Sequence, residues 1–266
     1  MRCPPSLRPA YRKGAKQLGL FAALQFLTII PWRRQFSPEE VGRSIGYFPV
    51  VGIFIGLILA GLNYLLSLFL PSAVVNVLLV ISLVVISGAL HLDGLVDTCD
   101  GIAGHKTPEE RWQVMHDSRA GGFGIIGVCC LLLVKYISLN SVPQSLIMLT
   151  LILLPVASRW AMVYAVFAYP YARPSGLGKV FKQGAGWPQL TMATLIALAV
   201  AVALFQLTGL VIMFAIWVIV VAMAAYLKRK FSGLTGDTYG AINEVAEVCM
   251  LLLVILLAHN QWLWLA

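Results

Sequence analysis

Charged side chains are scarce in this sequence of 266 residues. Only 11% of the residues are Asp, Glu, Lys or Arg and 60% are hydrophobic, whereas soluble domains have about 25% charged and about 45–50% apolar residues. A chain with so few polar groups cannot cover a water-facing surface, which excludes a soluble, disordered or collagen-like protein. A lipid bilayer removes that need, so the composition predicts an integral membrane protein.

Paired cysteines are also lacking. The five cysteines form no CxxC pair and lie mostly within apolar runs, so neither a disulfide framework nor a zinc site is indicated. The net charge is +8, which in a soluble protein would favour nucleic-acid binding. In a membrane protein the positions of Lys and Arg report orientation first, so we expect membrane lipid and no nucleic acid as a partner.

Long apolar runs are what the sequence does have. A membrane-spanning helix needs about 20 predominantly apolar residues. Seven stretches meet this requirement: 46–70, 73–90, 121–139, 146–168, 190–207, 210–227 and 241–258. They are too long and continuous for the alternating strands of a β-barrel. The predicted fold is therefore all-α, a polytopic integral membrane helical bundle with about seven transmembrane helices.

The basic residues divide the connections into two classes. The N-terminal arm and the segments 92–120, 169–189 and 228–240 hold 17 of the 19 Lys and Arg residues, while the other links carry no charged residue. By the positive-inside rule, the basic segments face the cytoplasm.

The segment 17–30 is apolar but has only 14 residues, with basic residues on both sides. We expect an interfacial or re-entrant helix. A signal peptide is the alternative, but no small-x-small cleavage site follows. The predicted organisation is a cytoplasmic basic arm, 1–45, with the interfacial helix, and one transmembrane domain, 46–266. Its functional loops are 91–120, 169–189 and 228–240.

The sequence has 11 acidic residues, and six of them lie in the loop after the second span. Asp93, Asp97 and Asp100 are spaced i, i+4 and i+7, so in a helix they share one face. Like charges at about 4 Å repel by about 1 kcal/mol in water and about 4 kcal/mol at an effective dielectric constant of 20, so this face calls for a cation. Oxygen ligands favour Mg²⁺, with Mn²⁺ or Ca²⁺ as alternatives. A solvated helix end is the simpler explanation.

Two glycine-rich segments carry groups that suit phosphate. In 115–124, Asp117, Ser118 and Arg119 precede glycines at the start of a span; amides at a helix start bind anions, and arginine grips phosphate through two hydrogen bonds. An ordinary turn with Asp117 as helix cap is the alternative. Lys179 lies among glycines in the loop after the fourth span but lacks the P-loop spacing.

Asp237, Glu244 and Glu247 form a second acidic stripe on the last span. Seven residues turn a helix by about 700°, which is about 20° short of two full turns, so Asp237 and Glu244 lie on the same face. Glu244 and Glu247 fall inside the apolar run, so they should be paired and functional; a bond to a neighbouring helix is the structural alternative. Arg159, inside the fourth span, is a candidate partner for either glutamate or for a substrate phosphate. Lys135 is expected to extend to the membrane surface and is assigned no role.

Together these groups place two carboxylate sets, one or two arginines and two glycine-rich loops at the cytoplasmic mouth of an apolar bundle. This arrangement suits a metal-bound phosphoanhydride, because in phosphoryl transfer the protein chiefly positions groups and neutralises charge. His91, His105 and His116 either assist proton transfer or are ordinary surface residues.

Three motifs, 91–101, 115–121 and 235–241 with Glu244 and Glu247, closely resemble those of the cobalamin synthase family, also called adenosylcobinamide-GDP ribazoletransferase. The resemblance covers nearly the whole chain, including 25–31 and 176–178. One departure is His116, where the family pattern leads us to expect an arginine. An imidazole there weakens the case for a permanent phosphate contact at this position.

The resemblance implies a Mg²⁺-dependent transferase of a bacterial cytoplasmic (inner) membrane, with its active site facing the cytoplasm. α-Ribazole, or its 5′-phosphate, attacks adenosylcobinamide-GDP and releases GMP in the last nucleotide-loop step of coenzyme B12 synthesis. A homo-oligomer is possible, and the sequence does not decide this.

Under this resemblance, roles can be assigned as hypotheses. The expected metal ligands are Asp93, Asp97, Asp100 and Asp237. The expected catalytic groups are Asp97, Asp100, Asp237 and Glu244, with Asp237 and Glu244 completing the metal shell or accepting the ribazole proton. The expected substrate or phosphate contacts are Asp117, Ser118, Arg119, Arg159, Lys179 and Glu247, with Arg119 and Lys179 offsetting charge on the departing GMP.

Two other classes remain open. A CDP-alcohol phosphotransferase also uses membrane-face aspartates, but Asp100-Gly101 is not followed by the arginine of that pattern. An ion-coupled transporter would use Glu244, Glu247 and Arg159, but the minimal, uncharged outer loops disfavour it.

Overall fold

The computed structural model is a bundle of helices, and it describes residues 11–30, 34–104, 107–117 and 119–261. Within these ranges the only β-type pairing is an isolated bridge between Tyr171 and Leu234. The helices are α1 (Tyr11–Leu27), α2 (Pro38–Arg43), the 3₁₀ helix η1 (Ser44–Tyr47), α3 (Phe48–Leu66), α4 (Ser72–Ile86), α5 (Leu90–Ile102), α6 (Pro108–Met115), α7 (Gly122–Ser141), α8 (Ile147–Ala168), α9 (Leu177–Gly184), α10 (Trp187–Phe231) and α11 (Gly236–His259). The predicted all-α fold is confirmed.

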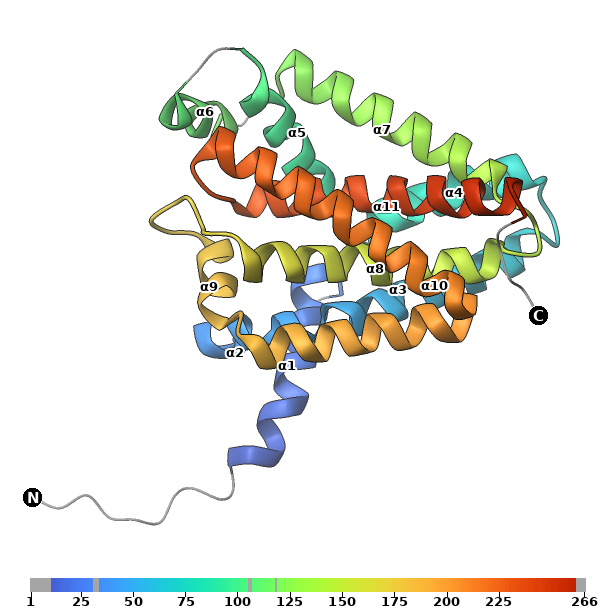
Figure 1. Cartoon of the computed structure of the whole chain (residues 1–266), viewed down its shortest axis with the longest axis horizontal. Coiled ribbons are helices and arrows are strands. Elements are labelled where there is room, and N and C mark those ends of the chain that lie inside the picture. The colour runs from blue at the N-terminus through green and yellow to red at the C-terminus, as the bar shows by residue number, and fades with distance from the viewer. Residues whose placement is uncertain (1–10, 31–33, 105–106, 118, 262–266) are drawn as a thin grey trace, which may run out of the picture.

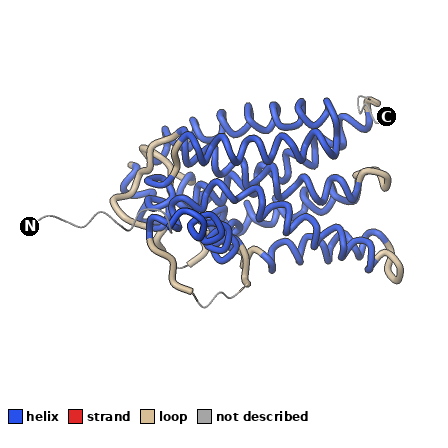
Figure 2. Tube along the Cα trace, turned by 90° about the horizontal axis from the view of Figure 1, so that it is seen from below, coloured by secondary structure: helices blue, strands red, loops and turns tan. Residues whose placement is uncertain are grey.

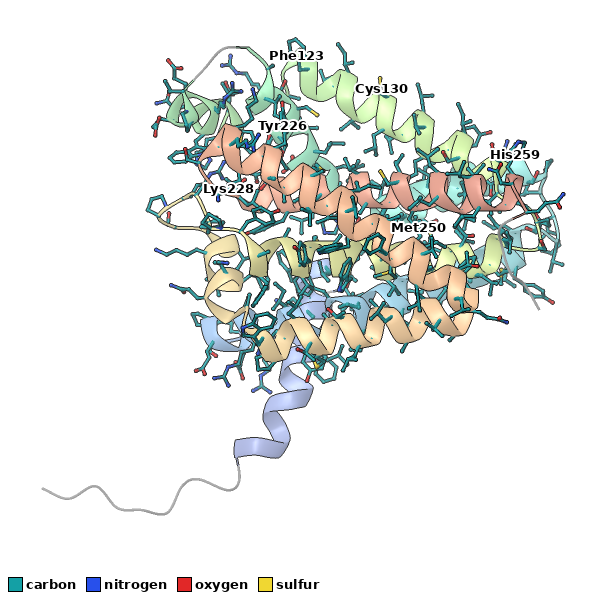
Figure 3. All side chains as sticks on the ribbon, viewed as in Figure 1. Phe123, Cys130, Tyr226, Lys228, Met250 and His259 are labelled. Carbon is teal, nitrogen blue, oxygen red and sulfur yellow. The ribbon has the colours of Figure 1, made fainter. Side chains whose placement is uncertain are left out.

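The long helices run side by side, and the two ends of the bundle differ (Figures 1 and 2). One end, here called the loop end, holds α2, α6, α9 and the first turn of α11. The opposite end has only short turns. Lys228 lies toward the loop end and His259 at the opposite end, and the side chains of Phe123 and Cys130 project outward from α7 (Figure 3). Functional side chains therefore have to be sought at the loop end, where the longer connections lie.

The predicted spans match the long helices closely. In the described part of the chain, five helices are long and apolar enough to cross a membrane, and the bent pair α4–α5 gives a sixth. The chain is thus a multi-pass membrane protein. The predicted number of seven spans is consistent with this result but is not confirmed by it. Two of the predicted spans lie within α10, which counts here as one helix.

Helix α10 contains a reversal rather than one straight run. Its 45 residues would extend about 68 Å at 1.5 Å per residue, more than twice the about 30 Å of a bilayer core. Gln206 has non-helical angles of φ 51° and ψ −135°, and a Cβ at Gly209 would collide with the carbonyl of Ala201. Two residues eight positions apart touch only if the chain folds back, so α10 is a helical hairpin (Figure 1).

Helix α8 lies at the centre of the bundle, where it packs against α3, α10 and α11. Gly52 and Gly56 of α3 lie directly against the backbone of α8 at Pro155 and Ile152, with no room for a Cβ. Small residues that allow such close approach are a common source of helix association in membranes. The centre of the bundle is therefore closely packed.

Helix α5 leaves the direction of α4 by 87°. The turn is made by Gly88 and Ala89, whose φ values are 60° and 57°. Beyond it, α5 lies at the loop end, where it packs against α7 and α11. This bend takes the aspartates of α5 out of the spanning part of the bundle.

The N-terminal apolar segment is helical, as expected. Helix α1 runs across the direction of the long helices in both views (Figures 1 and 2). Ala23 and Leu27 are buried, and the helix contacts α2, η1 and α3. Its placement in the membrane interface stays a prediction.

The interpretation of Lys135 was wrong. Its side chain does not extend to the surface but is 2% exposed, with Nζ 2.6 Å from Oε2 of Glu244 and 2.7 Å from Oε2 of Glu247. Arg159 Nη1 lies 2.5 Å from Oε1 of Glu247, which confirms the predicted pairing. A lysine side chain extends to water when no anion lies within its reach. Lys135 instead lies within reach of two buried carboxylates of α11. These four side chains join α7, α8 and α11 in one buried ionic network.

We expect Lys135→Met to lower the free energy of unfolding by about 3–5 kcal/mol, because it leaves buried carboxylates short of a counter-charge. Denaturation in mixed micelles measures the change. Lys135→Met combined with Glu244→Gln should recover a large part of the loss, since it restores charge balance among the remaining groups. An unchanged stability of the single variant would show that Lys135 is solvated.

Candidate active site

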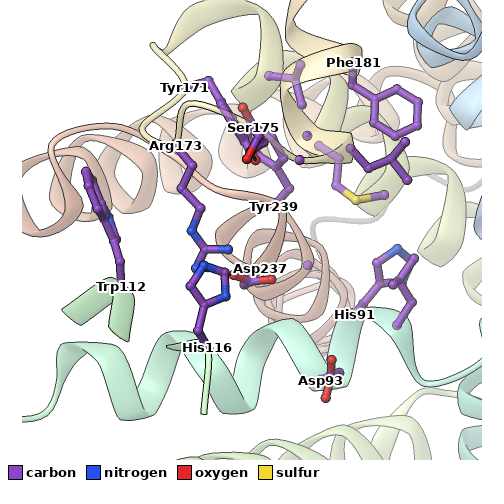
Figure 4. Close-up of a pocket in the computed structure, with 18 of the residues that line it drawn as sticks. His91, Asp93, Trp112, His116, Tyr171, Arg173, Ser175, Phe181, Asp237 and Tyr239 are labelled. Atoms are coloured by element: carbon purple, nitrogen blue, oxygen red, sulfur yellow. Dashed lines mark hydrogen bonds and ion pairs between the residues drawn. The ribbon is translucent and has the colours of Figure 1, made fainter. Parts of the chain in front are cut away.

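A cavity of about 630 Å³ opens at the loop end and reaches inward between α5, α8, α9 and α11 (Figure 4). We call it the loop-end cavity. We call the part lined by the polar residues Asp93, His116, Arg173 and Asp237 its mouth, and the part lined by apolar residues such as Phe181 its floor. One polar end and one apolar end are typical of sites that orient a small organic ligand.

Asp237 is held in the first turn of α11. Thr235 caps this helix: its Oγ1 accepts a hydrogen bond from the amide of Thr238, and Thr238 Oγ1 accepts one from the amide of Thr235. Asp237 Oδ2 lies 3.0 Å from Arg173 Nη2. The fixed capping turn therefore places a carboxylate at the mouth and an arginine against it.

The loop that carries Arg173 is tied to the start of α11. The amide of Leu234 donates to the carbonyl of Pro170, and the amide of Ala172 donates to the carbonyl of Leu234, both at 2.8 Å. Arg173 is thus positioned by backbone pairing on the preceding residues, which the sequence alone did not reveal.

Asp93 and Asp97 come to Asp237 from α5. Gly94 lies against the backbone of Asp237, where a Cβ would be 2.6 Å from its carbonyl oxygen, so the aspartates on either side of this glycine flank the start of α11. Burial raises the pKa of Asp97 to about 7, and the charges of Asp237 and Asp93 add to the effect. Unrelieved repulsion among acids from distant parts of the chain is what a cation would remove.

These carboxylates do not form a closed metal cage. Among the residues that the structure describes, no group of three or more His, Cys, Asp or Glu side chains is placed to hold a metal ion. Mg²⁺, however, is usually held by one or two carboxylates together with substrate phosphates and waters. The donor type and the excess negative charge therefore fit Mg²⁺ that arrives with a phosphorylated substrate.

Asp100 is turned away from this group. Its Oδ2 accepts a hydrogen bond of 2.7 Å from the amide of Gly121, and its Oδ1 accepts one of 2.8 Å from the amide of Gly124. The carboxylate therefore caps the start of α7. The predicted anion-binding glycines do bind an anion here, but the anion is the side chain of Asp100.

Asp117 and Arg119 lie outside the loop-end cavity. They pair with each other in an exposed position, with Arg119 Nη2 2.8 Å from Asp117 Oδ2, and they line a shallow hollow beside Asp100. Hydrogen bonds from Arg119 lower the pKa of Asp117 to about 2. Ser118, predicted with them, is outside the described residues.

The other predicted residues are divided between rim and interior. Lys179, on α9, donates to the carbonyl of Pro174, a residue of the cavity lining. Glu244, Glu247 and Arg159 belong to the buried ionic network. Since Glu244 follows Asp237 by seven residues, it lies about 10 Å further along α11, and the structure does not bring it to the mouth.

Sequence reasoning missed three residues of the cavity. In the loop after the fourth span, the sequence favoured Lys179 over Arg173 as the phosphate contact. For His91 it allowed either a role in proton transfer or an ordinary surface position, and it gave no role to Tyr239. His91 is instead buried in the cavity lining. The available signal was its place at the start of the motif 91–101, whereas its spacing of two residues from Asp93 puts the two side chains on different faces of a helix.

Comparisons with known proteins agree with this geometry. The family model "Cobalamin-5-phosphate synthase" matches residues 19–255. The chain belongs to this family. The resemblance inferred from the motifs is thus confirmed.

Two relatives are described as "Adenosylcobinamide-GDP ribazoletransferase". The protein of Geotalea daltonii is 40% identical over 237 residues, covering 88% of this chain and 96% of its own length. That of Desulforamulus reducens is 37% identical over 236 residues, covering 88% and 94%. No solved structure matches the chain.

The raised pKa of Asp97 has a measurable effect on stability. The carboxyl titrates near pH 7 in the folded chain and near 3.8 as a free group. Between these values the folded state retains a proton that the unfolded state has lost, so stability falls as the pH rises from about 4 to 7 and stays lower above.

Without divalent cations, we expect Asp97→Asn to raise the melting temperature by a few degrees at pH 8 and by less at pH 5. Thermal unfolding of purified protein with a chelator measures this difference. Glu39→Gln, in an exposed pair with Arg43, is the control and should change little at either pH. An equal effect of Asp97→Asn at both pH values would contradict the assigned titration.

Proposed function

We propose that this chain is an adenosylcobinamide-GDP ribazoletransferase. It joins adenosylcobinamide-GDP to α-ribazole or α-ribazole 5′-phosphate, giving adenosylcobalamin or its 5′-phosphate, and releases GMP. The observation that carries the proposal is that Asp93 and Asp237 line one cavity and that Asp97 lies close enough to feel the charge of both, although more than a hundred residues separate α5 from Asp237 in sequence. Family membership supports the same reaction.

The bonds exchanged define what the site has to do. A ribose hydroxyl of α-ribazole other than the 5′-hydroxyl, which stays free or phosphorylated in the product, attacks the cobinamide-side phosphorus, and the bond from that phosphorus to the bridging oxygen breaks. The bridging oxygen leaves with GMP, and the hydroxyl proton passes to a base. The protein therefore has to hold a diphosphate, orient a hydroxyl and accept one proton.

Asp93, Asp97 and Asp237 would hold Mg²⁺, which supplies positive charge to the diphosphate when bound. Asp237 also lines the cavity, which places it to accept the hydroxyl proton. Arg173, at the same mouth, offsets phosphate charge and is better placed for this than Arg119, which is paired and exposed on the outside. Asp100 fixes the end of α5 against α7.

The proposal includes a location. The basic residues lie in the segments at the loop end, and by the positive-inside rule this end faces the cytoplasm. We place the enzyme in a bacterial inner membrane with its cavity open to the cytoplasm, from which water-soluble α-ribazole would enter.

The direct test is turnover by purified protein in proteoliposomes. With adenosylcobinamide-GDP, α-ribazole and Mg²⁺, we expect GMP and the completed corrinoid in equal amounts. A chelator should abolish release of GMP, and excess Mg²⁺ should restore it. Omission of α-ribazole should prevent it. Release of GMP without α-ribazole would indicate a hydrolase and contradict the proposal.

We expect Asp97→Asn to lower kcat for GMP release by about 100-fold or more, because a charge that acts on the diphosphate is lost. The protein should remain folded, as judged by its elution from a size-exclusion column in detergent. Glu39→Gln serves as the matched control and should retain turnover. Turnover like that of the wild type would remove Asp97 from the site.

A further inference from the structure

The floor of the loop-end cavity contains buried polar groups without partners. His91 is 2% exposed and Tyr239 is 5% exposed, and both line the cavity. Within the described part of the chain, neither the ring nitrogens of His91 nor the hydroxyl of Tyr239 has a hydrogen-bond partner. Burying a polar group without a hydrogen-bond partner is unfavourable. A ligand that supplies the missing partner recovers this energy, so these groups mark a binding site.

His91 shares the cavity lining with aromatic and apolar side chains, while Arg159, Glu247 and Lys135 of the buried ionic network lie within electrostatic reach of its ring. Phe26, Phe48 and Phe181 come from α1, α3 and α9, and their ring centroids lie 4.6–5.9 Å apart. Met162 of α8 completes this part of the lining. Rings at such spacings contact one another, so the three form one aromatic wall against whose exposed side a flat ring can pack in a stacked or edge-on position. The floor thus offers a slot for an aromatic ring with one or two polar contacts.

The slot has a fixed position relative to the acidic mouth. A Cβ at Gly240 would lie 3.1 Å from the Cα of His91, so His91 packs against α11 at Gly240. Gly240 follows Asp237 by three residues, or about 4.5 Å along the helix. A nucleoside laid along α11 with its base at His91 therefore has its sugar directed toward Asp237.

We propose that the floor of the cavity binds the benzimidazole base of α-ribazole, and that His91 donates a hydrogen bond to the one unsubstituted ring nitrogen of that base. This inference rests on the proposed function, and it assigns the nucleoside to a place within the site. A neutral imidazole has one donor nitrogen to offer. His91 then determines specificity for the base, while Tyr239 faces the ribose.

The other parts of the two substrates fit this floor less well. Guanine carries several donors and acceptors along its edge, and each would need a partner in an apolar slot. A corrin macrocycle is much larger than the drug-sized ligands that cavities of this volume enclose. The diphosphate belongs with the charged mouth. The base of α-ribazole, flat and apolar with a single free nitrogen, matches all three features of the floor.

The test is a double cycle of protein and ligand, measured as Kd by equilibrium dialysis without turnover. The probes are α-ribazole and its indole analogue, in which C–H replaces the free ring nitrogen. We expect His91→Phe to weaken binding of α-ribazole by about 10- to 100-fold, as expected for one buried hydrogen bond. The wild type should bind the analogue as weakly as His91→Phe binds α-ribazole. His91→Phe should not weaken binding of the analogue further. His91→Gln should recover part of the loss, because its amide also donates.

The matched control is His259→Phe, since His259 lies exposed at the opposite end of the bundle; it should leave both Kd values unchanged. Binding of adenosylcobinamide-GDP should survive His91→Phe. Equal weakening of α-ribazole and analogue would show a merely structural role and overturn the inference, and so would selective loss of adenosylcobinamide-GDP, which would put guanine in the floor.

The remaining outcomes separate the two proposals. If His91→Phe does not fold, the wild type alone decides, because equally tight binding of both nucleosides overturns the inference. If the wild type forms GMP but does not distinguish the two nucleosides, the inference fails while the proposed function stands. If the wild type releases no GMP under any condition, the proposed function itself fails.

Discussion

The contact between α5 and α11 at Gly94 is the constraint on which the site depends. Because glycine has no side chain, the two backbones approach closely enough for Asp93 and Asp97 to flank the capping turn that holds Asp237. Any larger residue would separate the helices, and with them the acids. A site assembled this way places several like charges close together, and the resulting repulsion is offset only in part by Arg173. The same contact that builds the site thus leaves it with an excess of negative charge, which in the proposed function a cation would offset.

A second, separate electrostatic arrangement holds the bundle that carries the site. Lys135, Arg159, Glu244 and Glu247 balance one another in the interior and join α7, α8 and α11. Both sets of acids lie on or against α11, yet they differ in what satisfies them. The inner glutamates find cations of the protein, whereas the outer aspartates do not find enough of them. This difference separates structural from functional carboxylates more clearly than their spacing in sequence does.

The fold was largely predictable because apolar length and helix period are local properties. The predicted spans 146–168 and 241–258 agree with α8 and α11 within a few residues, and the helical spacing of Asp93 and Asp97 was sufficient to make them candidates. The fate of Asp100 and Lys135 was not predictable, because each depends on a partner from another helix. For Asp100 the partners are amides of α7, and for Lys135 they are carboxylates of α11. The burial of His91 was not predictable for the same reason, since it is set by the helices that pack around it.

The hydrogen bonds of Asp100 also have a topological consequence. They join residues 21 and 24 positions apart, so the chain between α5 and α7 is a closed loop. Arg111, within this loop, donates to the carbonyls of Gly101 and Ile102 at its beginning. Arg111 therefore ties helix α6 to the C-terminal end of α5, the helix that bears Asp93 and Asp97. The closed loop thus delivers Trp112 and His116 to the lining of the cavity from a stretch of chain that begins and ends at Asp100.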